Sequence, residues 1–342
     1  MKVLQVMSGA ERGGAEEFFV RLAAAFSQTS LSQKVVIRDY RERVDELVGS
    51  GVETEALPFS RWFDWRTPFT LKKIIEEWEP DVVLSWMSRA TEICSRVIPR
   101  PGPVHVGRMG GYYRLKYFGK CHHLIGNTMG MVRYIGELGW PKNNVHYLPN
   151  FVSSSRSPAL DRGLLTTPPD APLLLALGRL HTNKAFDVLL DALALLPDHW
   201  LWIAGSGPEE RALRIQARKL GIEKRVRFLG WRQDVARLFA SADVFVCSSR
   251  TEPLGNVVIE SWAQEVPVVA AAAAGPTELI THEVNGLLCP INDASQMAQA
   301  ISKTHGSMAQ SLCAEGLQKY QKFFSEQIVV DKYLQFFDLV KQ

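Results

Sequence analysis

Two carboxylates eight positions apart, Glu252 and Glu260, are the residues of this chain whose spacing most directly suggests chemistry. Pro253 and Gly255 follow Glu252 and keep it out of a helix interior, whereas Asn256 suits a position near a helix cap. The pattern predicts that Glu252 lies in a loop at a helix N-terminus and that Glu260 lies about one turn inside that helix.

The backbone N–H groups between the two carboxylates form the second part of this pattern. Those of Gly255, Asn256 and Val257 are expected to be unpaired, because the first amides of a helix have no intrahelical acceptor, and such amides favour an anion. A nucleotide sugar has a diphosphate in the middle and hydroxyl-rich rings at both ends, and it would match amides flanked by carboxylates. Two unrelated glutamates on a helix surface are the alternative interpretation.

Four shorter motifs follow predicted strands, and each contains glycine close to a helix start, a cation or an aromatic ring. They are Gly13-Gly14, Gly178-Arg179 with Lys184, Gly205-Ser-Gly207, and Gly230-Trp231. Glycine lets a ligand approach the backbone, and two cations beside a glycine suit a diphosphate. The alternatives are ordinary strand-to-helix turns, a solvated Arg179 and Lys184, and a half-buried aromatic side chain at Trp231.

The composition is that of a globular protein with room for two domains: 342 residues, 46% hydrophobic and 22% charged. A net charge of +3 is too small to indicate a nucleic acid as partner. Five scattered cysteines without a C-x-x-C pair favour free thiols in a reducing compartment. Neither a signal peptide nor a membrane span is recognised, so we expect a cytoplasmic protein.

Short β-branched runs alternate with helical stretches in both halves, which predicts parallel sheets covered on both faces. In the first half we expect strands at 3–6, 34–37, 52–57, 81–85, 104–106, 123–126 and 145–148, with helices including 16–26, 68–78 and 129–138. In the second half we expect strands at 173–177, 200–204, 226–229, 244–247, 266–270 and 287–289, with helices at 186–196, 209–220, 234–241, 256–263 and 294–305. The predicted fold class is α/β, with two Rossmann-like, doubly wound domains.

The segment 153–172 is rich in serine and proline, which predicts an inter-domain linker or exposed loop. We therefore expect one domain over residues 1–155 and a second over 165–325. The amphipathic tail 326–342 could pack on either domain by its pattern alone. Open parallel sheets bind ligands beyond the carboxyl ends of their strands, where the four glycine motifs are expected.

Taken in order, these motifs resemble those of the retaining glycosyltransferases of family 4, which have the GT-B fold. The most specific part is Glu252 followed after seven residues by Glu260. The resemblance extends over nearly the whole chain, and its other parts are Gly13–Glu16, Asn150, Gly178-Arg179 with Lys184, Gly205–Pro208, Gly230, Gly275–Ile280 and Asn285–Leu288.

The resemblance implies a metal-independent transfer of a sugar, without a cofactor, from a nucleotide sugar to an acceptor hydroxyl with retention. Arg179 and Lys184 would bind the diphosphate, Glu252 the hydroxyls of the donor sugar, and Glu260 the ribose. The other donor-binding positions would be Gly13, Gly14, Gly205, Gly207, Gly230, Trp231, Leu254, Gly255, Asn256 and Val257. The tail 326–342 would return to an acceptor-binding N-terminal domain, and the two domains would face a central cleft.

Two positions depart from the family pattern. Ala185 replaces the glycine that usually follows the lysine. Met109 occupies the place of a histidine that many members have, and His105, on the preceding strand, is expected to be structural. Glu252 would therefore act without the histidine that usually contacts the donor sugar.

A basic and aromatic segment, 96–142, contains eight Arg or Lys against one acid, Glu137. It suits an anionic acceptor or an anionic membrane surface, although a solvated face above core aromatics is an equal alternative. The candidate acceptor-binding residues are Arg108, Gly110, Gly111, Tyr112 and Tyr113. A glycan, a lipopolysaccharide core or a lipid-linked molecule is the expected acceptor, with peripheral contact to the inner face of the cytoplasmic membrane.

Two other functional classes remain open from the sequence. One is an epimerase or phosphorylase of GT-B shape, and the other is a non-catalytic module that binds a nucleotide sugar. No nucleic acid is expected as a partner in any of the three classes.

Overall fold

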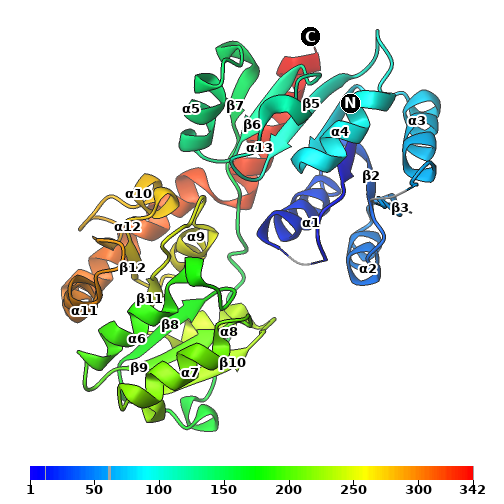
Figure 1. Cartoon of the computed structure of the whole chain (residues 1–342). Coiled ribbons are helices and arrows are strands. Elements are labelled where there is room, and N and C mark those ends of the chain that lie inside the picture. Colours follow the sequence, from blue (N-terminus) through cyan, green and yellow to red (C-terminus); the bar gives the residue numbers. More distant parts are fainter. Residues whose placement is uncertain (12, 61–62, 342) are drawn as a thin grey trace. The chain divides into compact units, whose positions relative to one another are not determined.

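The computed structural model describes residues 1–11, 13–60 and 63–341, so position 12 of the first glycine loop and position 342 of the tail lie outside the described residues. The chain divides into two compact units (Figure 1). Unit 1 comprises Met1–Phe151 and Glu326–Gln342, and unit 2 comprises Val152–Ser325.

Unit 1 contains a seven-stranded parallel sheet with the order β3-β2-β1-β4-β5-β6-β7. Its strands are β1 (Lys2–Met7), β2 (Ser32–Arg38), β3 (Thr54–Leu57), β4 (Val82–Trp86), β5 (Val104–Met109), β6 (His123–Gly126) and β7 (Val145–Tyr147). Its α-helices are α1 (Gly14–Phe26), α2 (Arg41–Gly49), α3 (Arg66–Trp78), α4 (Met87–Val97), α5 (Met129–Glu137) and α13 (Glu326–Lys341).

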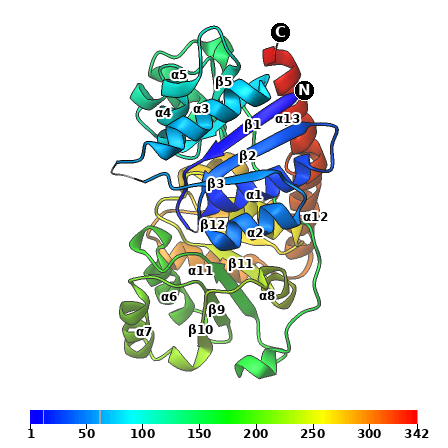
Figure 2. The same ribbon diagram turned by 90° about the vertical axis from the view of Figure 1, so that its right-hand side faces the viewer.

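Both faces of this sheet are covered, because alternate residues of each strand point to opposite sides. Val3 and Met7 of β1 pack in one cluster with side chains of α1, α2 and α13, while Leu4 and Val6 pack in another with α3 and α4. In Figure 2, α3 and α4 lie on one side of β1 and β2, and α1, α2 and α13 lie on the other. Strands buried on both faces explain the continuous apolar runs in the sequence.

The last helix, α13, belongs to unit 1 although it follows unit 2 in the chain. Its aromatic side chains pack against α1: the ring centroids of Tyr333 and Phe337 each lie 5.9 Å from that of Phe26. Tyr333 and Phe337 are fully buried. Helix α13 is therefore part of the core of unit 1.

Unit 2 contains a six-stranded parallel sheet with the order β10-β9-β8-β11-β12-β13. Its strands are β8 (Leu173–Leu177), β9 (Trp200–Ala204), β10 (Val226–Gly230), β11 (Val244–Cys247), β12 (Val268–Ala271) and β13 (Leu287–Cys289). Its α-helices are α6 (Phe186–Ala194), α7 (Glu210–Lys219), α8 (Val235–Ser241), α9 (Asn256–Ala263), α10 (Ala274–Leu279), α11 (Ala294–Lys303) and α12 (Gly306–Phe323).

Two hydrophobic clusters lie on opposite faces of this second sheet. Leu174 and Ala176 of β8 pack with side chains of α6, α7 and α11, whereas Leu173 and Leu175 pack with α8 and α9. Each unit is thus a doubly wound, parallel α/β structure, which confirms the predicted fold class. Among the helices of the described chain, none has both the length and the apolar character needed to span a bilayer.

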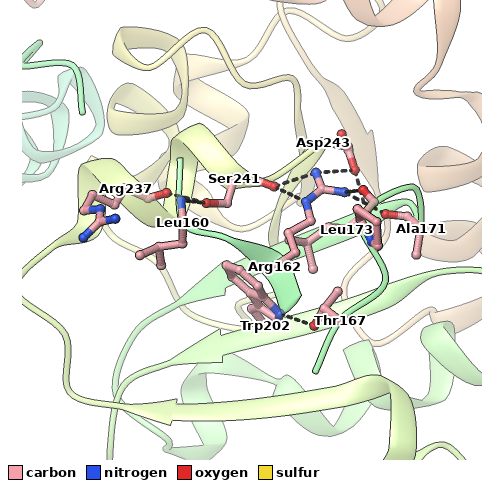
Figure 3. Close-up of polar contacts among 10 residues, drawn as sticks. Leu160, Arg162, Thr167, Ala171, Leu173, Trp202, Arg237, Ser241 and Asp243 are labelled. Atoms are coloured by element: carbon pink, nitrogen blue, oxygen red, sulfur yellow. Dashed lines mark hydrogen bonds and ion pairs between the residues drawn. The ribbon is translucent and has the colours of Figure 1, made fainter. Parts of the chain in front are cut away.

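The serine- and proline-rich segment is fixed on unit 2 rather than extended as a linker (Figure 3). The guanidinium of Arg162 donates to the carbonyls of Ser241, Pro169 and Ala171 and to the carboxylate of Asp243. The same carboxylate accepts the amide of Leu173 at the start of β8. Composition predicted exposure correctly at many of these positions, but it could not reveal that one arginine would hold the segment in place.

His105 lies on β5 and is buried in unit 1, in agreement with the structural role expected for it. Its Nε2 is 2.8 Å from the hydroxyl of Ser85, and the Cys121 thiol is 3.7 Å from its Nδ1. Burial, with smaller contributions from His122 and Arg100, lowers the pKa of His105 to about 3. The ring is therefore neutral in the folded protein at physiological pH.

This depressed pKa predicts a loss of stability in acid. Between the unfolded pKa of about 6.5 and the folded value, the unfolded chain binds a proton that the folded chain does not, so stability falls as pH falls. Between pH 7 and pH 5, the free energy of unfolding of the parent protein should fall by up to about 2 kcal/mol more than that of His105→Asn, whose side chain does not titrate. Urea unfolding at the two pH values measures the difference, and equal losses would contradict a neutral His105.

Candidate functional site

The site begins where the order of strands in unit 2 reverses, between β8 and β11. After β8 the chain continues to β9 on one side of the sheet, and after β11 it continues to β12 on the other side. The loops that follow β8 and β11 therefore diverge. Open α/β sheets bind ligands in the crevice formed by such a divergence. Residues 178–185 follow β8 and residues 248–255 follow β11, and these two loops contain the predicted donor-binding residues Arg179, Lys184, Glu252, Leu254 and Gly255.

Lys184 and Glu252, one from each loop, form an ion pair at this point. The Lys184 Nζ lies 2.5 Å from Glu252 Oε2, and the side chains are only 24% and 12% exposed. Burial lowers the pKa of Lys184, but the charge and hydrogen bond of Glu252 outweigh it, with minor help from Cys247 and Glu260, so the net pKa is raised. Lys184 is therefore a positive charge held at the switch point of the sheet.

The two loops are joined by further hydrogen bonds beneath this pair. The Ser248 hydroxyl donates to the carbonyl of Lys184 at 2.8 Å, and the amide of Arg250 donates to the carbonyl of Asn183 at 2.8 Å. The guanidinium of Arg250 forms two bonds to the carboxylate of Asp187 on α6, at 2.8 and 2.6 Å. Paired, bidentate geometry of this kind fixes the relative position of two elements.

Arg250 and Ser248 were not among the residues predicted for the site. Arg250 acts as a positioning residue, because its guanidinium also donates to the carbonyl of Thr182 at 2.8 Å in the loop that carries Lys184. The only signal in the sequence was the location of Arg250 directly between a strand end and Glu252. Its partner is 63 positions away, and no local pattern identifies it.

Helix α9 begins at the predicted residue, Asn256, after Gly255 in the left-handed region (φ 82°, ψ 38°). One expectation for this helix start is wrong: the Gly255 amide is not unpaired, because it donates to Glu252 Oε1 at 3.3 Å. Asn256 and Val257 supply amides of the first turn, which have no intrahelical acceptor. Glu252 thus occupies the anion-favouring end of α9 in the structure, in contact with Lys184.

The main chain of Glu252 is held by the first turn of α10. The Gly275 amide donates to the Glu252 carbonyl at 2.7 Å. A Cβ atom at Gly275 would lie 2.6 Å from the carbonyl carbon of Leu254 and 2.7 Å from the Glu252 oxygen. Only glycine therefore allows this approach, and it explains the presence of Gly275 beside the carboxylate loop.

Three glycine-bearing strand ends pack backbone against backbone beside Lys184. The Gly178 amide donates to the Ala204 carbonyl at 3.0 Å, and the Gly205 amide donates to the Gly230 carbonyl at 2.7 Å. A Cβ at Gly205 would lie 1.9 Å from the Gly178 oxygen, and one at Gly207 would lie 2.3 Å from the Leu180 oxygen. For Gly205 and Gly207 the structure therefore supports the turn interpretation directly.

Arg179 and Trp231 leave this backbone layer toward solvent. Arg179 is exposed and lacks an ion-pair partner among the described residues, although it directly follows Gly178. Trp231 is 50% exposed and follows Gly230, whose φ of +66° lies in the left-handed region. Both side chains are accessible at the same carboxyl edge of the sheet as Lys184.

In unit 1, the predicted Gly13 and Gly14 lie at the start of α1, beside the buried carboxylate of Glu16. The Ala10 amide donates to Glu16 Oε1 at 2.7 Å, and a Cβ at Gly13 would lie 2.4 Å from Glu16 Oε2. Gly13 therefore provides room for this carboxylate. Gly14 is exposed in the first turn of the helix.

The loop after β5 carries four of the predicted acceptor-binding residues at the carboxyl edge of the unit 1 sheet. A Cβ at Gly110 would lie 3.5 Å from Ala15 Cβ and 3.7 Å from Met87 Cγ, so the loops after β1, β4 and β5 meet there. Gly111 follows, Tyr112 is 46% exposed, and Tyr113 stacks with Phe118 at 6.4 Å between centroids. Met109, which the resemblance places where many family members have histidine, is buried in a core cluster with Phe118.

The structure contradicts the acceptor-binding role predicted for Arg108. Its side chain is 1% exposed, its Nε donates to the Tyr333 hydroxyl at 2.8 Å, and its Nη2 donates to Asn150 at 2.5 Å. Its guanidinium also lies 4.3 Å from the Trp86 ring and 4.8 Å from the Phe18 ring. Arg108 joins β5 to α13 inside unit 1, where an acceptor has no access.

Known proteins with similar sequences give this arrangement its context. Residues 171–306, which include the whole Lys184–Glu252 region, match the family described as Glycosyl transferases group 1. The lipopolysaccharide core biosynthesis glycosyltransferase LpsE of Rhizobium meliloti (strain 1021) is 36% identical over 98% of this chain and 98% of its own. The core glycosyltransferase LpsD of the same strain is 33% identical over 99% and 98%. The chain belongs to the group 1 glycosyltransferases.

Solved structures of other glycosyltransferases share this fold. The crystal structure of Anabaena Alr3699/HepE in complex with UDP has a TM-score of 0.88 and 19% identity over 99% of this chain and 100% of its own. The apo form of the lipopolysaccharide outer core galactosyltransferase WaaB has a TM-score of 0.77 and 16% identity over the whole of both chains. These structures confirm the predicted GT-B fold, and the two relatives that match almost the full chain confirm the prediction of a transferase.

Ala185 stands where the sequence resemblance predicts a glycine, and the structure shows its backbone conformation. Ala185 adopts the left-handed conformation (φ 52°, ψ 38°) between the turn of Lys184 and helix α6. A left-handed residue other than glycine costs roughly 1–2 kcal/mol. The methyl group is fully buried in the cluster around α6, and this burial offsets part of that cost.

The backbone layer of this glycosyltransferase predicts a marked difference between two glycines of unit 2. We expect Gly205→Ala to lower the free energy of unfolding by about 2–4 kcal/mol, because its Cβ collides with a fixed carbonyl and its φ is +143°. Gly221→Ala, at φ +70° with open space around it, is expected to lose only about 1 kcal/mol. Urea unfolding measures both variants, and equal losses would contradict the close contact of the strand ends.

Proposed function

We propose that this glycosyltransferase transfers a sugar from a nucleoside-diphosphate sugar to a hydroxyl of a lipopolysaccharide-core or lipid-linked glycan. In the proposal, the anomeric configuration is retained and no metal ion takes part. The names of the two relatives that match almost the full chain support a lipopolysaccharide-core acceptor. A structural neighbour crystallised with UDP supports a nucleoside-diphosphate donor.

The observation that carries the proposal is the ion pair between Lys184 and Glu252. A donor diphosphate would compete with Glu252 for the ammonium group, and its negative charge would take over the contact. The Glu252 carboxylate would then be released to accept hydrogen bonds from hydroxyls of the donor sugar. The pair thus prepares a cation for the leaving group and an acceptor for the sugar at adjacent positions.

Transfer places growing negative charge on the departing phosphate while the sugar becomes oxocarbenium-like. Lys184, whose raised pKa keeps it protonated, and the exposed Arg179 would stabilise that charge. The first-turn amides of Asn256 and Val257 would add the positive end of α9. Fixed groups of this kind need no reorganisation during the reaction, which is the physical basis for proposing transfer without a metal.

The other ends of the donor would be held by side chains around this centre. Glu260 would accept from the ribose hydroxyls, and the backbone of Gly230 with Trp231 would contact the base. Retention would follow from attack of the acceptor hydroxyl on the face that the diphosphate leaves, with the leaving phosphate accepting the proton. Gly110 and Gly111 of unit 1 would shape the acceptor side. We place the enzyme at the cytoplasmic face of the inner membrane, where its acceptor would be presented.

Replacement of either member of the ion pair tests this function. Glu252→Ala and Lys184→Ala are each expected to lower kcat by a factor of about 100 or more, because each removes a group that acts on the developing charges. Initial rates with a panel of nucleotide sugars measure the effect. Glu315→Ala, an exposed carboxylate on α12, is the matched control and should leave the rate unchanged. Full activity of Glu252→Ala, or donor binding without any turnover in the parent protein, would overturn the proposal.

A chelator tests the absence of a metal from the mechanism. Because Lys184 and Arg179 are proposed to neutralise the diphosphate, the rate of transfer should be the same in excess EDTA as in magnesium buffer. Loss of activity in EDTA, restored by a divalent cation, would show that the fixed cations do not suffice.

A further inference from the structure

Three large exposed aromatic side chains lie close together in the sequence of unit 1, just before α3 and in its first turn. Phe63 is 99% exposed, Trp65 is 75% exposed and Phe69 is 65% exposed. Single exposed apolar residues are ordinary, but three aromatic residues within seven positions form a surface that a soluble protein normally keeps covered. We call Phe63, Trp65 and Phe69 the aromatic tip.

Hydrogen bonds to the Asp64 carboxylate fix described residues next to the aromatic tip. The carboxylate of Asp64 accepts the Ser60 amide at 2.8 Å, the Thr67 amide at 2.9 Å and the Thr67 hydroxyl at 2.7 Å. The fully buried Thr67 also accepts the amide of the buried Phe59. Phe63 itself has a φ of +53°, a conformation that bulky residues adopt only where the surrounding structure imposes it.

The geometry of α3 directs the other two rings outward. Trp65 caps the helix and Phe69 lies four positions later, so the two rings share one face. The opposite face, with Leu71 and Ile75, is buried in the core of unit 1. Neither ring can therefore turn inward without displacing core residues.

Exposed cationic side chains lie close to the aromatic tip in the sequence. Over residues 63–73 the chain carries Arg66, Lys72 and Lys73 against one acid, Asp64, and all three cations are exposed. Lys72 and Lys73 reach Glu76 and Glu77 only at 3.6 Å, in solvent-exposed pairs that contribute little. Glu76 and Glu77 lie one turn further along α3. The N-terminal part of α3, which carries the aromatic side chains, is therefore the more positive part of this helix.

Exposed Trp and Phe beside Arg and Lys match the interface of an anionic membrane, where rings enter the headgroup region and cations meet lipid phosphates. We infer that the aromatic tip inserts into an anionic bilayer and anchors this glycosyltransferase to it. The inference deepens the proposed membrane location, on which it rests. It also moves the membrane contact away from segment 96–142, whose Phe118 is buried and whose Tyr113 and Tyr117 pack against the same core cluster.

Vesicle flotation of the full-length chain tests this assignment. Vesicles of phosphatidylethanolamine with phosphatidylglycerol should float the parent protein, and vesicles of phosphatidylcholine alone should float less of it. The variant Phe63→Ser/Trp65→Ser/Phe69→Ser should lose at least about ten-fold in partitioning, because its apolar anchor is gone. The variant Leu164→Ser/Leu195→Ser/Leu339→Ser, which removes three exposed leucines elsewhere, should float like the parent.

Three results would overturn the assignment: no flotation of the parent protein, equal flotation of the aromatic variant, or aromatic-dependent self-association in sedimentation without vesicle binding. The second result would return the membrane contact to a different surface. Slow hydrolysis of the donor, measured without lipid, should be the same in the aromatic variant and the parent. That readout separates a failure of the membrane anchor from a failure of the proposed transferase mechanism.

Discussion

The ion pair between Lys184 and Glu252 is the central interaction of unit 2, because the loops after its two central strands meet there. Each charge comes from the loop after one of the two central strands, and each is largely withdrawn from water. A buried charge without a partner is strongly unfavourable, so each residue makes the other's position tolerable. The pair thus satisfies both charges within the protein, and in the proposed function a donor diphosphate would bind by replacing Glu252 as the partner of Lys184.

Such an exchange would require the two loops to keep their conformation, and main-chain hydrogen bonds around them hold that conformation. Strand ends at Gly178, Gly205 and Gly230 bond to one another directly, without intervening side chains. Gly275 supports Glu252 from below in the same manner. Arg250 then joins the two loops to α6 through Asp187. The loops after β8 and β11 are therefore fixed by main-chain contacts that only glycine permits. The side chains that the proposed function uses, Lys184 and Glu252, lie on this backbone layer.

Strand positions, and the location of Lys184 and Glu252 in loops that follow strands, could be predicted from the sequence, because apolar runs and strand-end motifs are local. Helices α2, α4, α10 and α12 were not among the predicted helices; α2 is mostly polar and α12 contains Gly306 and Gly316. The pairing of Lys184 with Glu252 was also missed, since each was assigned to a ligand. The acceptor-binding role predicted for Arg108 was wrong for another reason. Strand β5 is buried on both faces, so its sequence pattern does not show which side chains reach solvent.

Helix α13 completes the core of unit 1 only after the whole of unit 2 has been made. During synthesis, domains fold as units as they emerge, the earlier ones first. For this chain, β1 to β7 leave the ribosome long before Tyr333 and Phe337 arrive to cover Phe26 and to bind Arg108. The first unit to begin folding is therefore the last to finish, and a nascent chain must protect an open apolar face while some 170 residues of the second unit are translated.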